Sequence, residues 1–169
     1  MQQDQTKKDF LKFWEHIPWK SQDETLIVLK GHLLIEDLMR EYCASKVDKS
    51  SELEKAKLTF PQVSYLTRSL QKYEAPSWVW GAVSKLNGLR NGLAHNLTPR
   101  NYESKRDEFT EFVRSENKGD LFEQFPRDFE RLGVAIFMIY TALSVNLRFK
   151  PKGLLTLAME LDDSKSSNN

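Results

Sequence analysis

The chain has 169 residues, of which 40% are hydrophobic and 29% are charged. That size and balance are typical of one folded domain and exclude an intrinsically disordered chain. With 25 basic and 24 acidic residues the net charge is +1. Proteins that coat duplex DNA carry a general basic excess, so this charge excludes that class, although a local basic patch remains compatible with it.

Cysteine content and apolar segments restrict the class of protein further. Cys43 is the single cysteine, so neither an internal disulfide nor a cysteine-rich metal site can form, and we expect no cofactor. The longest apolar segment, 133–145, is shorter than the about 20 residues that span a membrane, and it predicts a buried core helix. The polar N-terminal residues show no signal peptide, so we expect a cytoplasmic protein that does not contact a membrane.

Two helices are expected in the first quarter of the chain. Apolar residues at helical spacing predict a helix over 6–17, which Pro18 ends. Ser21 followed by Glu24 has the pattern of a capping box and predicts the start of a second helix. This helix is apolar on more than one side over 26–43, which places it either at the centre of a bundle or at a dimer interface.

The rest of the chain is also expected to be helical. The polar segment 48–57 reads as a loop with at most one helical turn, and 118–120 reads as a turn. Further helices are expected over 61–72, 77–96, 102–114 and 127–148.

These elements predict an all-α fold, a single-domain helical bundle of five to six helices. No β-hairpin signal and no internal repeat is present. We divide the chain into an N-terminal helix (1–20), the helical bundle (21–150) and a C-terminal extension (151–169) that is partly disordered.

Three glycines interrupt the expected helix at 77–96, namely Gly81, Gly88 and Gly92. Each costs about 1 kcal/mol relative to alanine in a helix interior. A helix with that burden often lets another backbone or a ligand come close.

Arg90, Asn91 and His95 in this helix form a set suited to phosphodiester chemistry. Arginine stabilises charge on a phosphate, and histidine can move a proton to or from a ribose 2′-hydroxyl or a leaving oxygen without a metal. Asn91 and His95 share a helix face, whereas Arg90 and His95 point about 140° apart on a straight helix. Bringing them together requires that the arginine reaches round or that the glycines distort the helix.

The segment from Arg90 to His95 resembles the HEPN superfamily of helical domains, whose ribonuclease members carry Arg-x4–6-His with a polar residue commonly after the arginine. Here that residue is Asn91, and the motif lies late in a helix of a small bundle. Segment 31–36 is similar to the first core helix of such domains, and the resemblance covers 21–148.

The resemblance implies a metal-independent endoribonuclease that works as a homodimer, with two Arg–His motifs facing across the interface in one composite cleft. It also implies a toxin or phage-defence effector that cleaves RNA, with an antitoxin or other partner protein as a further expectation. One toxin branch carries Arg-x4-His-x-Tyr, in which the tyrosine is modified by its antitoxin. Leu97 stands at that position here, which argues against that mode of control.

A non-catalytic alternative stays open, in which the domain is a nucleotide-binding or protein-interaction module. A separate structural alternative is that Arg90 pairs with a carboxylate and that His95 caps the C-terminus of its helix.

Other residues are candidates for substrate binding or support. Glu36 shares a helix face with His32, and the two form either a mutually satisfied polar pair or a support near the site. Asn96 and Lys85 are further candidates near the motif. Nearby basic residues could guide an RNA backbone or form a solvated face, and two tryptophans could stack a base or pack in the core: Arg100, Lys105, Arg106, Trp78 and Trp80.

Overall fold

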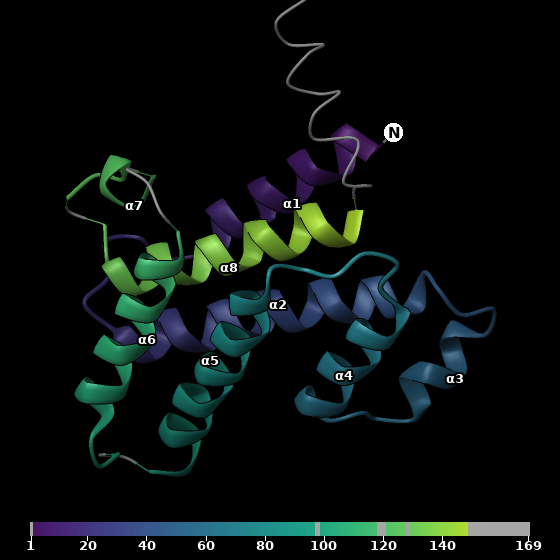
Figure 1. The fold of residues 1–169 in the computed structure, drawn as a ribbon. Helices are drawn as coiled ribbons and strands as arrows, with labels where there is room; N and C mark the ends of the chain where they lie inside the picture. Colours follow the sequence, from purple (N-terminus) through teal and green to yellow (C-terminus); the bar gives the residue numbers. More distant parts are fainter. Residues whose placement is uncertain (1, 97–98, 118–120, 128, 149–169) are drawn as a thin grey trace, which may run out of the picture.

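The structure, a computed structural model, describes residues 2–96, 99–117, 121–127 and 129–148. Within these ranges it contains helices and no strand, which confirms the all-α bundle (Figure 1). The helices are α1 (Gln2–His16), α2 (Glu24–Ala44), α3 (Ser50–Lys55), α4 (Phe60–Leu70), α5 (Ser77–His95), α6 (Tyr102–Glu116), α7 (Leu121–Gln124) and α8 (Arg131–Arg148).

The number of helices is larger than the expected five to six, because two short ones were not anticipated. Helix α3 forms in the polar segment that we expected to be a loop, and the single turn α7 precedes the last long helix. The expected turn at 118–120, the residue Leu97 and the C-terminal extension lie outside the described residues.

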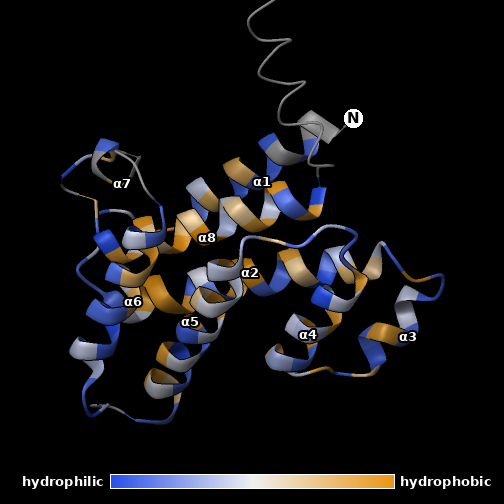
Figure 2. Cartoon of the chain, viewed as in Figure 1, coloured by the Kyte–Doolittle hydropathy of each residue, from blue (hydrophilic) through white to orange (hydrophobic). Residues whose placement is uncertain are grey.

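Helix α8 lies at the centre of the bundle. Every residue from Leu132 to Tyr140 is buried, which confirms the buried helix predicted from the apolar segment. Helix α1 packs on one side of α8, and α2, α5 and α6 pack on the others (Figure 1). Figure 2 shows hydrophobic residues along α8 and α2 and mostly hydrophilic residues on α6. No helix in the described part of the chain combines the length and hydrophobicity that a bilayer crossing requires.

Helix α2 crosses α8 at very short range because Gly31 has no side chain. A Cβ placed on Gly31 would lie 2.6 Å from Cγ2 and 2.9 Å from Cδ1 of Ile136. Helices α4 and α5 pack on further sides of α2, and Leu33 stays 58% exposed. Most of the apolar excess of α2 therefore reflects contacts with several helices of the bundle.

A buried ionic cluster fixes α1 to the end of α8. The carboxylate of Asp9 accepts hydrogen bonds from Nε (3.0 Å) and Nη2 (3.3 Å) of Arg148 and from Oγ of Ser144 (2.8 Å). Arg148 also pairs with Glu41 of α2 (3.0 Å). Because a buried carboxylate is costly unless it is paired and hydrogen-bonded, this cluster favours one docking of α1.

The starts of three helices differ from the expectation. Helix α1 begins at Gln2, four residues earlier than expected. The capping box predicted at Ser21 and Glu24 is wrong, because Asp23 caps α2 by accepting a hydrogen bond from the backbone N of Leu26 (3.0 Å). Helix α8 begins four residues later than expected, because the backbone N of Glu130 donates to the carbonyl oxygen of Trp19 (2.9 Å), which holds the preceding residues as a connection.

The surroundings of Gly31 and Gly88 predict opposite effects on stability when each glycine is replaced by alanine. Gly31→Ala should lower the free energy of unfolding by about 1–3 kcal/mol, because the new methyl group overlaps Ile136. Gly88→Ala should raise it by up to about 1 kcal/mol, because an added Cβ meets nothing within 4 Å and the helix gains propensity. Urea unfolding of both variants measures this, and equal effects of the same sign would contradict the close α2–α8 contact.

Candidate functional site

Helix α5 carries Arg90, Asn91 and His95 in its second half and continues without a break to His95. A regular helix turns by about 100° per residue, so the side chains of Arg90 and His95 leave α5 about 140° apart. Arg90 is half-buried on the side of α2 and α4, whereas His95 is exposed at the end of the helix. Within one chain the two side chains therefore serve different surfaces, and the glycines do not bend α5 to join them.

Arg90 lines a polar pocket of about 310 Å³ between α2, α4 and α5, which we call the Arg90 pocket. It is lined by His32, Glu36 and Arg40 from α2, by Leu58, Thr59, Phe60 and Pro61 at the start of α4, and by Asn87, Arg90 and Asn91 from α5. Three of the predicted residues thus meet here, namely Arg90, Asn91 and Glu36.

Arg90 has no carboxylate partner among the described residues. Its Nη1 donates a hydrogen bond to Oδ1 of Asn91 (3.1 Å), which holds the guanidinium at the pocket wall. The described residues therefore do not show the structural ion pair of Arg90 that the alternative requires. A guanidinium without a neutralising carboxylate suits a phosphate group.

His32 joins α2 to α5 inside the Arg90 pocket. Its side chain is buried, and Nε2 donates a hydrogen bond to Oδ1 of Asn87 (3.2 Å). The His32 ring also lies against Phe60, with ring centroids 4.1 Å apart. Burial lowers the pKa of His32; the Asn87 hydrogen bond and the Glu36 carboxylate oppose this in part, and the charge of Arg90 reinforces it. His32 is consequently neutral at pH 7 and fixes the position of Asn87.

Glu36 is held by Arg40 one helical turn further along α2. Its Oε1 accepts from Nε (2.9 Å) and Nη2 (2.6 Å) of Arg40, and its Oε2 lies 3.8 Å from Nδ1 of His32. Arg40 also donates to the carbonyl oxygen of Leu58 (2.6 Å), which fixes the segment before α4. Glu36 thus supports the pocket wall. Among the described residues, no group of three or more His, Cys, Asp or Glu side chains is arranged to hold a metal ion.

The remaining predicted residues lie outside the Arg90 pocket. Asn96 caps α5, and its backbone N–H (3.2 Å) and Nδ2 (3.4 Å) both donate to the carbonyl oxygen of Gly92. Lys85 turns to the opposite neighbour, α6, where it pairs with Glu108 and lies over the ring of Phe112. Asn96 is therefore exposed beside His95, whereas Lys85 is separated from both groups.

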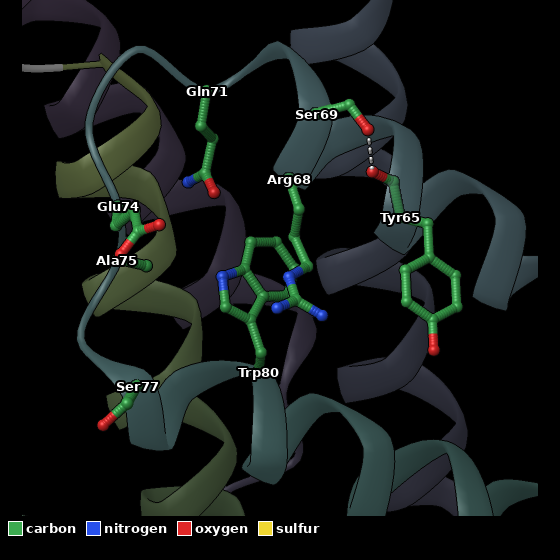
Figure 3. Close-up of a pocket in the computed structure, with 8 residues that line it drawn as sticks. All are labelled: Tyr65, Arg68, Ser69, Gln71, Glu74, Ala75, Ser77 and Trp80. Atoms are coloured by element: carbon green, nitrogen blue, oxygen red, sulfur yellow. Dashed lines mark hydrogen bonds between the residues drawn. The ribbon is translucent and has the colours of Figure 1, made fainter.

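The Arg90 pocket continues into two further pockets between α4 and α5, and the three together are the α4/α5 groove. The middle pocket shares Phe60, Pro61 and Asn87 with the Arg90 pocket. The upper pocket, of about 570 Å³, is lined by Tyr65, Arg68, Ser69, Gln71, Glu74, Ala75, Ser77 and Trp80 (Figure 3). Arg68 and Tyr65 belong to no motif, and the sequence analysis missed them along with Asn87 and Arg40.

Comparisons with models of protein families, with curated proteins and with solved structures found no match to this chain.

The burial of His32 predicts a pH dependence of stability. Its pKa is lower in the folded protein than in the unfolded chain, where it is near 6.5, so the unfolded chain binds the proton first as the pH falls. The contribution of neutral His32 to the free energy of unfolding is therefore complete above pH 6.5. It is lost as the pH falls from 6.5 towards the lower pKa of His32 in the folded protein. Urea unfolding of wild type and His32→Gln at pH 7.5 and pH 5 should show the smaller acid-induced loss in the variant.

His16→Gln is the matched control, because His16 is exposed on α1. It should follow the wild type at both pH values. Equal losses in wild type and His32→Gln would contradict the buried neutral state of His32.

Proposed function

We propose that the protein is a metal-independent endoribonuclease of the HEPN type, which acts as a homodimer on RNA. The observation that carries this proposal is the presence on α5 of an arginine and a histidine that have no ionic partner among the described residues. Arg90 sits in a polar pocket without a carboxylate partner, and His95 is exposed five residues further on, with no hydrogen-bonding or ionic partner among the described residues. These are the two groups that the resemblance to HEPN ribonucleases assigns to catalysis.

The divergence of Arg90 and His95 favours a composite site. The outer face of α5, outside the α4/α5 groove, carries Gly88 and His95, which point about 20° apart at 100° per residue. Both are exposed, and the space around Gly88 is open. A second copy placed against this face brings its own motif beside His95, and Gly88 lets the two helices approach closely.

The reaction is attack of a ribose 2′-hydroxyl on the adjacent phosphate. One His95 takes the 2′-hydroxyl proton as the O2′–P bond forms, and the histidine of the second copy gives a proton to the 5′ oxygen as the P–O5′ bond breaks. Arg90 binds the non-bridging oxygens and stabilises their developing charge. The products are a 2′,3′-cyclic phosphate end and a 5′-hydroxyl end.

The biological role that accompanies this activity in HEPN ribonucleases is that of a toxin or phage-defence effector. We include that role in the proposal, together with cytoplasmic action and control by an antitoxin or another partner protein. Because Leu97 replaces the tyrosine of one toxin branch, control by modification of that tyrosine is not part of the proposal.

Removal of either group on α5 should abolish RNA cleavage. We expect wild type to cleave a mixture of tRNA and mRNA in EDTA, and His95→Ala and Arg90→Ala each to reduce the rate by at least about 100-fold. End-group analysis of the wild-type products should give 2′,3′-cyclic phosphates. The matched controls are His16→Ala and Arg114→Gln, which alter a histidine and an arginine on exposed surfaces of α1 and α6.

Cleavage by His95→Ala at the wild-type rate would refute the catalytic assignment. RNA binding without cleavage by wild type would instead support the non-catalytic nucleotide-binding module.

A bulky residue on the outer face of α5 should separate the two copies. Gly88→Trp projects into open space in the single chain, so each chain should stay folded, with the helical circular-dichroism spectrum of wild type, while both the dimer and RNA cleavage are lost. Sedimentation velocity measures the oligomeric state. Ser51→Trp on the exposed side of α3 is the control and should remain dimeric, and a dimeric, active Gly88→Trp would contradict the composite site.

A further inference from the structure

The upper pocket of the α4/α5 groove has no role in the cleavage chemistry, yet it brings together an arginine and two aromatic rings. Its volume of about 570 Å³ falls within the range of pockets that hold small ligands or cofactors. It lies between α4, the start of α5 and the segment that connects them (Figure 3).

Arg68 is the cation of this pocket and is held by two aromatic rings. The guanidinium carbon lies 5.7 Å from the ring centroid of Trp80 and 5.8 Å from that of Tyr65. Figure 3 shows Arg68 extending from α4 towards Trp80 of α5. No carboxylate of the described residues pairs with Arg68. A guanidinium positioned by aromatic contacts and free of an ion pair presents its N–H groups to an anion, with a geometry that matches phosphate.

Tyr65 is an exposed aromatic residue beside this cation. It is 66% exposed, the largest exposed fraction among the large hydrophobic residues that the structure describes as exposed. The burial of its ring contributes little to the core, so its presence on the surface is not explained by packing. An aromatic ring next to an unpaired arginine is suited to stacking of an unpaired base whose phosphate binds the arginine.

The groove leads from this pocket to the proposed catalytic residues. The middle pocket contains Tyr65, Arg68 and Trp80 and also Asn87, which lines the Arg90 pocket. The groove follows α5 from Ser77 to Asn91, and the 14 steps between these residues correspond to about 21 Å at 1.5 Å per residue. Arg68 and Arg90 thus belong to one groove, whose other lining residues include the amides Asn87 and Asn91 and the ring of Tyr65.

We propose that the α4/α5 groove binds a segment of single-stranded RNA, with a phosphate on Arg68 and an unpaired base stacked on Tyr65. This proposal rests on the proposed function and assigns the substrate path of the same enzyme. Duplex RNA does not fit, because its bases are stacked on each other and present no free face to Tyr65. Tyr65 and Arg68 would contact a nucleotide upstream or downstream of the cleaved phosphate. The groove therefore favours RNA with an unpaired segment next to the cleavage site.

Glu74 allows a second test, in which RNA binding should become stronger and not weaker. Its carboxylate belongs to the upper pocket and is exposed, so it repels a phosphate that binds Arg68. Removal of this charge should strengthen RNA binding, whereas removal of Arg68 should weaken it.

The test measures binding of a fluorescein-labelled, unstructured 12-nucleotide RNA by fluorescence anisotropy in the full chain carrying His95→Ala, which prevents cleavage. Tyr65→Ala should weaken binding about tenfold, while Tyr65→Phe keeps the ring and should bind like the parent. Arg68→Gln should weaken binding about tenfold and reduce the slope of log affinity against log salt by about 0.7, the value for one lost phosphate contact on a single strand. Glu74→Gln should strengthen binding about twofold.

Arg114→Gln on α6 is the matched arginine control and should leave affinity and salt slope unchanged. Wild-type affinity in both Tyr65→Ala and Arg68→Gln would overturn the proposal, even if His95-dependent cleavage is observed. Conversely, Tyr65-dependent and Arg68-dependent binding by a chain that cleaves no RNA would support the groove and refute the ribonuclease. Equal competition by a duplex of the same sequence would also overturn the assignment to single strands.

Discussion

The contact between Gly31 and Ile136 is the constraint on which the arrangement of the bundle depends. Helix α8 is buried over nearly its whole length and can have few alternative positions. A Cβ on Gly31 would come within 2.6 Å of Ile136. The backbone of α2 therefore packs directly against a side chain of α8 at this point. His32 directly follows Gly31, so the contact between α2 and α8 also fixes the position of His32, whose side chain reaches Asn87 of α5.

The polar face of α2 then determines where Arg90 lies. His32 holds Asn87, and Glu36 holds Arg40, which binds the carbonyl oxygen of Leu58. These bonds join α2 to α5 and to the segment that opens α4. Since buried polar groups are costly when a partner is removed, the network favours a single relative position of the three helices. The Arg90 pocket is the space that they enclose.

Much of the fold could be predicted from hydrophobic spacing alone. The continuous apolar segment of α8 and the two-sided apolar pattern of α2 gave the correct core, because burial on several sides requires such sequences. The errors lie where local signals compete. Ser21 and Asp23 are both good helix caps, and only the chain path decides between them. Helix α3 has no apolar face and no buried residue, so its sequence resembles a loop.

The site was less predictable, because its neighbours are brought together by tertiary contacts. The spacing of Arg90 and His95 indicates their divergence, and the structure keeps α5 regular and so retains it. By contrast, His32 and Asn87 are 55 residues apart, and nothing local in either segment indicates the pair. Arg68 and Tyr65 are ordinary surface residues in sequence, and their significance arises from the placement of α4 beside Trp80.

A net charge of +1 is compatible with the proposed RNA path, because a local group of cations can attract a phosphate even where the total charge is balanced. Arg40, Arg106 and Arg148 each have a carboxylate partner, and such pairs contribute little field at a distance. Arg68 and Arg90 differ in that no described carboxylate neutralises them, and both open onto the α4/α5 groove. Two arginines without an ion pair in one groove favour the proposed contact with a short segment of an RNA chain over general adhesion to nucleic acid.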